Sequence, residues 1–287
     1  MTQSNNVTPG SAYWNQRFAL ENARERLLSL WRTVGHPVDL CGFQIAQLFA
    51  LALEFQPDLI LELGRGYGNS TCVFTEAAHR LPKPCQVISL GDCATWDHKT
   101  IPRLRSVADE DWFRPLDAPI GDILAFDFEK ALAGKKRVLI FWDAHGFDVA
   151  EYVLGTLLRL VQHMPHIVAL HDMTDLRYNG EPDPNGEYAV WKGSDNGEGR
   201  FCIGNLYSKV PQAISVLDFA TRNRLSFDSA DHSIHTTIGL DPLKKSEMHS
   251  VVGPELFDTK AFWYWFTLNE HAGPYKFPPA KRPLKIA

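Results

Sequence analysis

The sequence lacks the features expected of a nucleic-acid-binding, secreted or membrane-spanning protein. Its formal net charge of -5 and isoelectric point near 6.1 leave no excess of basic residues, and a phosphate-binding face usually needs one. The chain does not open with a basic segment followed by an apolar core, so no signal peptide is expected. The longest apolar stretch, near Ile45–Phe55, is interrupted by Gln47 and Glu54 and is too short to cross a bilayer.

The cysteines also lack a pattern. There are five, scattered and without a C-x-x-C pair, so they provide neither a zinc site nor a disulfide framework. They are Cys41, Cys72, Cys85, Cys93 and Cys202. This usage fits free thiols in a reducing compartment. We therefore expect a cytoplasmic protein whose partner is a small molecule rather than a nucleic acid or a membrane; a homo-oligomer is compatible with the sequence.

From Pro57 onward, short apolar runs alternate with helical stretches, which is typical of parallel α/β units. Runs such as VLIFW and IVAL are apolar at nearly every position, as strands buried on both faces are. We predict an α/β fold with a Rossmann-like, mostly parallel sheet flanked by helices. The expected strands are Leu59–Leu63, Gln86–Leu90, Val138–Trp142 and Ile167–Leu170, with a weaker one near Phe113–Pro119. Helices are expected at Ser70–Arg80, Phe128–Leu132, Val149–Met164 and Pro211–Asn223.

The two ends of the chain are expected to extend this domain. Residues 1–40 form a predicted N-terminal helical extension, with a helix over Trp14–Val34, and residues 41–240 form the α/β domain, which opens with a helix over Gln44–Phe55. Residues 241–287 complete it with a late strand at the aromatic run Phe262–Phe266, followed by a proline-rich tail. We expect that strand to pair antiparallel with one near Ser233–Gly239.

A long segment rich in Gly, Asn, Asp and Pro interrupts the domain at residues 175–200. It follows the fifth predicted strand closely. Loops of this length are often lids or binding loops, although a mobile insertion without function has the same composition. Both interpretations remain open.

A glycine-rich turn follows the first predicted strand. Gly64, Gly66 and Gly68 alternate there, and a helix is expected to begin at Ser70 and Thr71. Glycine lets the backbone turn sharply and lets a ligand approach it closely. The unpaired N–H groups at a helix N-terminus suit a carboxylate or a phosphate. The pattern predicts a cofactor loop; a glycine turn without a ligand is the alternative.

The spacing of this turn helps to choose among cofactors. The dinucleotide fingerprint G-x-G-x-x-G needs a third glycine at the position that Asn69 occupies. Glu62 stands two residues before the first glycine, where its carboxylate can attract an ammonium group. An amine together with a carboxylate describes the methionine part of S-adenosylmethionine. A nicotinamide cofactor fits less well.

The run E-L-G-x-G-x-G-N-S-T resembles motif I of the class I S-adenosylmethionine-dependent methyltransferases. Its continuation is similar to the subgroup of small-molecule and sugar O-methyltransferases, and the resemblance covers roughly residues 40–175. It implies that S-adenosylmethionine is the cofactor. The residues implied to bind it are Glu62, Gly64, Gly66, Gly68, Ser70 and Thr71.

Two further acidic residues are candidates for binding the rest of the cofactor. Asp92 follows the second strand, about where the family holds the ribose hydroxyls, although Gly91 could occupy that position. Asp122 matches the position that contacts the adenine amine in similar enzymes. Asp127 competes with it for that role, and a plain helix-capping role for Asp122 is equally compatible with the sequence.

The fourth and fifth predicted strands each end in an Asp and a His. Asp143 and His145 follow one strand, and His171 and Asp172 follow the other, so a parallel sheet should bring them together. Carboxylate and imidazole suit Mg²⁺ or Mn²⁺, and metal-dependent O-methyltransferases carry acidic residues at these strand ends. Asp143, His171 and Asp172 are the candidate metal ligands; Met173 stands where that family has an Asn, and structural pairing is the alternative.

The catalytic candidates are His145, as a general base, and Asp143. Imidazole accepts protons near neutral pH, whereas the catechol-type enzymes use a lysine at the position of Gly146. The sequence thus predicts an enzyme that O-methylates a small-molecule or sugar hydroxyl, with or without a metal. A non-catalytic module that binds S-adenosylmethionine and a nicotinamide-dependent oxidoreductase are the alternatives.

Overall fold

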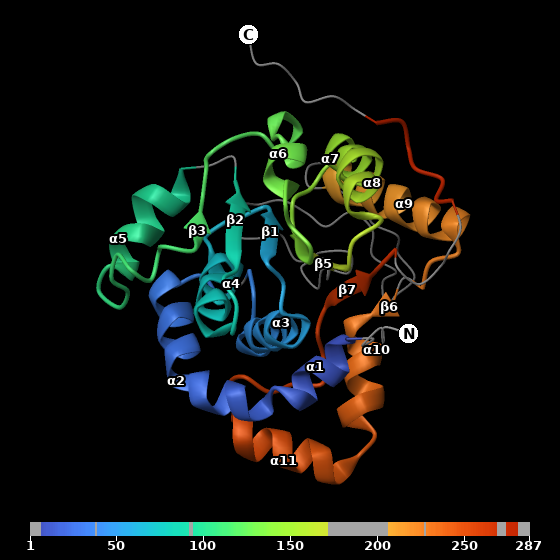
Figure 1. Ribbon diagram of the computed structural model, residues 1–287. Helices are drawn as coiled ribbons and strands as arrows, with labels where there is room; N and C mark the ends of the chain where they lie inside the picture. Colours follow the sequence, from blue (N-terminus) through green and yellow to red (C-terminus); the bar gives the residue numbers. More distant parts are fainter. Residues whose placement is uncertain are drawn as a thin grey trace.

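The computed structural model describes residues 7–37, 39–91, 94–171, 206–226, 228–268 and 274–280, without the side chains of residues 206–211 (Figure 1). Asp92, Asp172 and the predicted loop 175–200 therefore lie outside the described residues.

A seven-stranded sheet forms the centre of the molecule, with the strand order β3-β2-β1-β4-β5-β7-β6. The first five strands in this order are parallel to one another, and β7 runs antiparallel to both β5 and β6. The strands are β1 (Leu59–Leu63), β2 (Gln86–Leu90), β3 (Leu116–Asp117), β4 (Val138–Trp142), β5 (His166–His171), β6 (Asp228–Ser229) and β7 (Trp263–Phe266). The predicted fold class is confirmed, including the antiparallel late strands.

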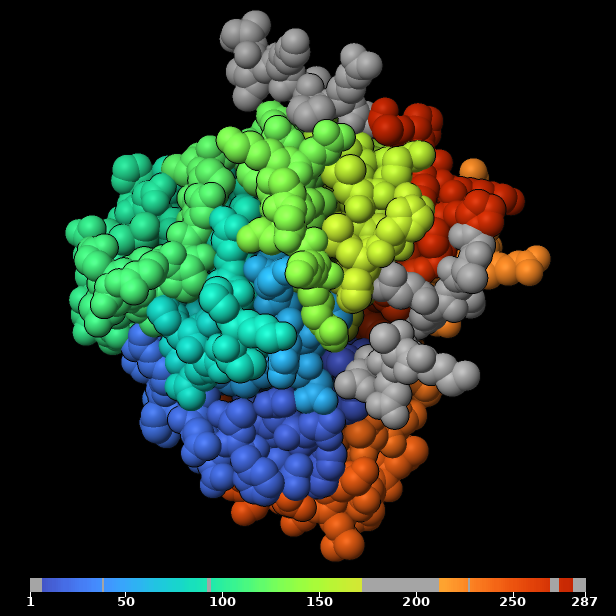
Figure 2. Space-filling view, viewed as in Figure 1, coloured from blue at the N-terminus to red at the C-terminus, as the bar shows by residue number. Residues whose placement is uncertain are grey.

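Helices cover both faces of this sheet (Figure 1). On one face lie α1 (Pro9–Asn15), α2 (Arg17–Val34), α3 (Gly42–Phe55), α4 (Asn69–Arg80), α10 (Ala230–Ile234) and α11 (Pro242–Val252). On the other lie α6 (Phe128–Leu132), α7 (Phe147–Tyr152), α8 (Leu158–Val161) and α9 (Leu206–Asn223). The short α5 (Ile101–Leu104) packs beside α2. Figure 2 shows the N-terminal segment and α11 together at the bottom of the molecule.

The strand side chains divide between two cores because successive residues of a strand point to opposite faces. Ile60 of β1 and Leu139 of β4 belong to the core beneath α3 and α4, whereas Leu61 and Ile140 belong to the core beneath α7 and α8. Every residue of β4 and β5 is buried, as predicted from their apolar runs, and so is every residue of β1. Residues of α1 and α2 share the first core, so the N-terminal helices pack directly against the sheet layer.

The prediction of a strand near Ser233–Gly239 is wrong, because α10 and a π-helical turn over His235–Gly239 occupy this segment. Ala230, Ile234 and Ile238 are all buried at a spacing of four residues, which places them on one face of a helix. The hydroxyls of Thr236 and Thr237 donate to carbonyl groups of the preceding turn of this helical segment. The aromatic strand β7 pairs with β5 and β6 instead.

Part of the predicted tail packs against the domain. Tyr275 and Phe277 contact the core beneath α8 and α9. The backbone of Lys276 exchanges two hydrogen bonds with the side chain of Asn223, at 2.6 and 3.2 Å. Across the described residues, no helix combines the length and the apolar character that a membrane span requires.

His166, at the start of β5, couples the stability of the fold to pH. Its Nδ1 lies 2.9 Å from the carbonyl oxygen of Met164, and its Nε2 accepts a hydrogen bond from the backbone N–H of Leu268 at 3.0 Å. The ring is 2% exposed. Burial lowers the pKa of His166 to about 4, from about 6.5 in an unfolded chain. The native ring therefore stays neutral where the unfolded one is protonated.

We expect the free energy of unfolding to fall as the pH drops from 6.5 towards 4, since the unfolded state then binds the extra proton. The gap between the two pKa values corresponds to about 3 kcal/mol at most. Urea unfolding of the wild type and of His166→Gln at several pH values measures this contribution. The variant should lose stability less steeply over this pH range; identical slopes would contradict the assignment to His166.

Candidate functional site

The glycine turn connects β1 to α4 at the carboxyl edge of the sheet, where ligands bind in open α/β folds. Gly64, Gly66 and Gly68 all have positive φ angles, of 99°, 52° and 93°. Side chains disfavour this region, which explains why glycine stands at each of the three positions. The sequence therefore folds here into the sharp turn that the spacing predicts.

The three glycines serve different purposes. A Cβ atom on Gly64 would lie 2.6 Å from the backbone nitrogen of Ala144, and one on Gly68 would lie 2.3 Å from the ring of Trp96. These two positions are glycine because the protein itself packs against them. A Cβ atom on Gly66 would meet no described atom closer than 3.7 Å, the Oδ2 atom of Asp39. Gly66 is thus the glycine with room beside it for a ligand.

Glu62 lies beneath this turn, fully buried within β1. Its Oε2 atom accepts a hydrogen bond from Thr71 Oγ1 at 2.5 Å and another from Ser89 Oγ. Ser89 can reach it because the two residues are directly opposite each other in the β1–β2 register. Oε1 is also buried and receives no well-formed hydrogen bond from a described residue, although the Ser70 hydroxyl lies near enough to favour the ionised carboxyl. A buried carboxylate oxygen without such a bond costs free energy, which a cationic donor would recover.

Burial raises the pKa of Glu62 to about 7, against the opposing effect of the neighbouring hydroxyls and of Arg65. The carboxyl is thus neutral below neutral pH and ionised above it. The nearby N-terminus of α4 begins at Gly68 without a side-chain cap, although Ser70 and Thr71 are buried in its first turn. Unpaired N–H groups at such an N-terminus favour an anionic group. The site therefore offers a carboxyl and an uncapped helix end.

Arg65 and Trp96, which the sequence analysis did not single out, stabilise the turn. Arg65 is 3% exposed and donates to the carbonyl oxygens of Ser89 at 2.6 Å and Pro119 at 3.2 Å. Its guanidinium lies 5.9 Å from the Trp96 ring, which packs on Gly68. The position of Arg65 between two glycines could have indicated this role, because a long cationic side chain in a tight turn needs hydrogen-bond acceptors nearby.

The segment between α2 and α3 lies against the outer side of the turn. The His36 ring stacks on Tyr67 with centroids 3.7 Å apart, and Asn69 donates to the carbonyl oxygen of His36 at 2.7 Å. His36 also pairs with Asp39 at 3.2 Å. Asn69, which replaces the third glycine of the dinucleotide fingerprint, thus connects the turn to the N-terminal helices.

The predicted ribose and adenine residues receive less support from the structure. Asp122 accepts a hydrogen bond from the backbone N–H of Leu124 at 2.9 Å and caps the short helical turn Ile123–Ala125. Its competitor, Asp127, caps α6 in the same way. The helix-capping alternative for Asp122 is therefore observed, and its contact with a cofactor stays a prediction.

The ends of β4 and β5 meet, as predicted from the parallel sheet. His171 Nδ1 lies 3.0 Å from Asp143 Oδ1. The opposite ring nitrogen of His171 lies 3.1 Å from Gln44 Nε2, in the first turn of α3. His171 is buried, and the side chain of Asp143 is 23% exposed. Gln44 was not identified from the sequence, although its place three residues after the helix cap Cys41 is that of a capping box.

His145 lies just after Asp143 but faces a different element. Its Nδ1 atom is 3.3 Å from Gln212 Oε1 on α9. His145 is partly exposed, as a proton acceptor at an open site must be.

The described residues do not assemble a metal site. No group of three or more His, Cys, Asp or Glu side chains among them could hold an ion. His171 fits poorly as a ligand here because both ring nitrogens already face hydrogen-bond partners. Asp172, the third predicted ligand, lies outside the described residues.

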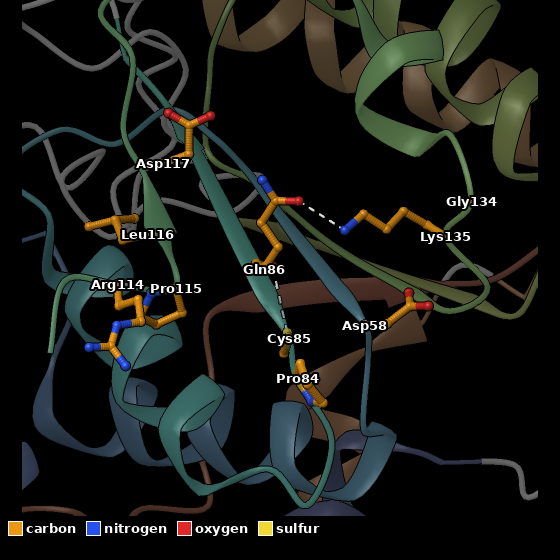
Figure 3. A pocket seen from close by; sticks show the side chains of 10 residues that line it. All are labelled: Asp58, Pro84, Cys85, Gln86, Arg114, Pro115, Leu116, Asp117, Gly134 and Lys135. Atoms are coloured by element: carbon orange, nitrogen blue, oxygen red, sulfur yellow. Dashed lines mark hydrogen bonds between the residues drawn. The ribbon is translucent and has the colours of Figure 1, made fainter. Parts of the chain in front are cut away.

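A separate hollow of about 470 Å³ opens at the opposite ends of the strands, where β1 and β2 begin (Figure 3). Lys135 donates to Gln86 Oε1 across it at 2.9 Å. The Asp58 carboxylate accepts from the backbone N–H groups of Lys136 and Arg137 at 2.8 and 3.0 Å. These polar groups serve the local fold. The hollow lies at the amino ends of the strands, away from the glycine turn.

Comparison with solved structures finds similar chains among methyltransferases. The O-methyltransferase TomG from Streptomyces achromogenes, involved in tomaymycin synthesis and solved with SAM, is 18% identical, with 70% of this chain and 81% of that chain covered and a TM-score of 0.44. The SAH-bound methyltransferase PaMTH1 from Podospora anserina is 16% identical, with 70% and 81% covered and a TM-score of 0.46. The O-methyltransferase from Bacillus cereus in complex with SAH is 15% identical, with 72% and 82% covered and a TM-score of 0.43. No protein-family model matches the chain, and the comparison with curated proteins found no match.

The separate purposes of the three glycines predict unequal effects of alanine substitutions. Gly64→Ala should lower the free energy of unfolding by about 3 kcal/mol or more, because the new Cβ meets the Ala144 backbone at a strained φ angle. Gly66→Ala should cost only about 1 kcal/mol, since it adds the backbone strain without a clash. Urea unfolding of both variants at one pH tests this order. Equal losses would contradict the close approach of Gly64 to the Ala144 backbone.

Proposed function

We propose that this protein is an S-adenosylmethionine-dependent methyltransferase that acts on a hydroxyl group of a small molecule. The observation that carries the proposal is the buried Glu62 carboxyl, whose Oε1 atom receives no well-formed hydrogen bond from a described residue, beneath a glycine turn with open space at Gly66. A cationic amine is the group that such an oxygen lacks.

The geometry supports a definite arrangement of the co-substrate. Glu62 would accept a hydrogen bond from its ammonium group, and the uncapped N-terminus of α4 would take its carboxylate. Gly66 would let the ligand approach the backbone. The predicted contacts of Asp92 with the ribose and of Asp122 with the adenine are part of the proposal.

The reaction would join the acceptor oxygen to the methyl carbon as the carbon–sulfur bond breaks and its electron pair stays on sulfur. The hydroxyl proton must leave, and the imidazole of His145 would accept it. Asp143, held by His171, would orient the acceptor hydroxyl at the end of β4. Such alignment of two reactants supplies much of the rate in a displacement reaction.

No step is assigned to a metal ion. His171 faces Asp143 and Gln44 through its two ring nitrogens, so its role is structural in this arrangement. Methyl transfer that survives chelation with EDTA would agree with this assignment; activity that is lost and then restored by Mg²⁺ or Mn²⁺ would instead support the ligand set predicted from the sequence.

A non-catalytic module that binds the same co-substrate is the second candidate, because Gly146 and Met173 depart from the metal-dependent enzymes. The two candidates differ in turnover. Isotope transfer from methyl-labelled S-adenosylmethionine to a panel of phenols, catechols and glycosides would favour the enzyme. Tight binding without transfer to any acceptor would favour the module.

Binding itself is the first prediction of the proposal. Isothermal titration calorimetry should detect S-adenosylhomocysteine binding to the wild type at neutral pH. Glu62→Gln should bind roughly 10- to 100-fold more weakly, because it loses a charge-assisted hydrogen bond. Thr75→Val is a control, since Thr75 is buried on α4, one turn after Thr71, but donates to the carbonyl oxygen of Thr71 and not to Glu62. No binding at millimolar ligand would refute the proposal.

The raised pKa of Glu62 predicts how this binding changes with pH. An ammonium group favours the ionised carboxyl, so the ligand must displace a proton from Glu62 below about pH 7. The affinity for S-adenosylhomocysteine should therefore rise about tenfold per pH unit up to pH 7 and then level off. Glu62→Gln should remove this dependence. A slope that persists in Glu62→Gln would assign the titration to another group.

A further inference from the structure

A chain of hydrogen bonds connects the first turn of α3 to the reaction centre. Gln44 is 3% exposed, and its Oε1 atom accepts from the backbone N–H of Cys41 at 2.8 Å. Its Nε2 atom donates to the carbonyl oxygen of Ala261 at 2.8 Å and lies 3.1 Å from His171 Nε2. The other nitrogen of His171 lies 3.0 Å from Asp143 Oδ1.

The backbone partners fix which way the Gln44 amide points. A backbone N–H can only donate and a carbonyl oxygen can only accept, so Oε1 must face Cys41 and the NH₂ group must face Ala261. The remaining hydrogen of the NH₂ group then points at His171 Nε2. An amide flip is excluded because the NH₂ group would then face the N–H donor of Cys41 and the amide oxygen would face the carbonyl acceptor of Ala261.

This orientation determines the protonation of the imidazole ring. Because Gln44 donates to Nε2, that nitrogen must accept and carries no hydrogen. The single hydrogen of the neutral ring is therefore on Nδ1 and is donated to Asp143 Oδ1. A hydrogen on Nε2 would meet the amide N–H of Gln44. We infer that Gln44 is a positioning residue that holds His171 in the Nδ1–H form, so that His171 fixes the Asp143 carboxylate at the end of β4.

The Ala261 end of this series of hydrogen bonds is also held in place. The Asp231 carboxylate accepts hydrogen bonds from the backbone N–H groups of Ala261 and Phe262, at 2.8 and 3.0 Å. Phe262 has a φ angle of 63°, which is unfavourable for an aromatic residue and needs such support. The carbonyl group to which Gln44 donates is thus held in place by α10, through the side chain of Asp231.

The role of Gln44 rests on the proposed function only insofar as Asp143 orients the acceptor; the form of His171 is a property of the protein alone. A neighbouring residue provides a matched control. Gln47, one turn along α3, is 1% exposed and donates to the carbonyl oxygen of Lys260 at 2.7 Å, while its Oε1 atom accepts from Trp263. It bonds the same segment but does not contact His171.

The first measurement is the tautomer of His171 by ¹⁵N NMR of histidine-labelled protein, with the signal assigned by its loss in His171→Gln. The wild type should show the Nδ1–H form, without any ligand. Gln44→Glu replaces the donor with an acceptor and should place a hydrogen on Nε2. Gln47→Glu adds the same charge to the same buried helix and should leave the Nδ1–H form intact. A wild-type ring protonated on Nε2 would overturn the inference without any need for a variant.

The second measurement is turnover with whichever acceptor is methylated in the isotope screen. Gln44→Glu should lower kcat roughly 10- to 100-fold, because a displaced Asp143 no longer aligns the acceptor, with the KM for S-adenosylmethionine unchanged. Gln47→Glu should keep kcat within about twofold of the wild type. An equal loss in both variants would reduce Gln44 to a structural role. If no acceptor is methylated, the proposed enzyme fails while the tautomer measurement still decides on Gln44.

Discussion

The close contact between the ends of β1 and β4 is the constraint on which the site depends. The pairing of these strands continues one residue past their ends, where the backbone N–H of Asp143 donates to the carbonyl oxygen of Leu63 at 2.8 Å. Directly beyond it, the backbone of Gly64 approaches Ala144 so closely that a side chain on Gly64 would clash. The glycine turn and the proposed reaction centre at the end of β4 thus share one backbone contact.

The same strand register decides which helices must support the site. Successive residues of a strand alternate between the two faces of the sheet. Glu62 points to the face of Ile60, and His171 points to the face of Ala169, and both of these neighbours lie in the core beneath α3 and α4. These two helices supply part of the hydrogen bonding that the buried polar groups need, beside the partners on neighbouring strands. Thr71 of α4 serves Glu62, and Gln44 of α3 serves His171.

The sheet could be predicted from the sequence because its strands are buried on both faces. β1, β2 and β4 begin and end at the predicted residues, since a run that is apolar at most positions leaves little freedom in where a central strand stops. The prediction of a strand near Ser233–Gly239 was wrong because the local sequence preference and the packing disagree there. The β-branched residues of this segment favour a strand locally. Its buried residues recur every four positions, however, and this period is that of a helix.

The candidate site was predictable where one segment carries the whole pattern, as the glycine turn does. It was not predictable where partners come from distant segments. Gln44 shows the difference: its capping of α3 depends on Cys41, three residues away, whereas its bond to His171 spans 127 residues. The first role can be predicted from local spacing, whereas the second becomes apparent only in the folded structure. Because one amide group performs both, the start of α3 and the orientation of Asp143 are mechanically linked, and a shift of that helix end would release the His171 ring.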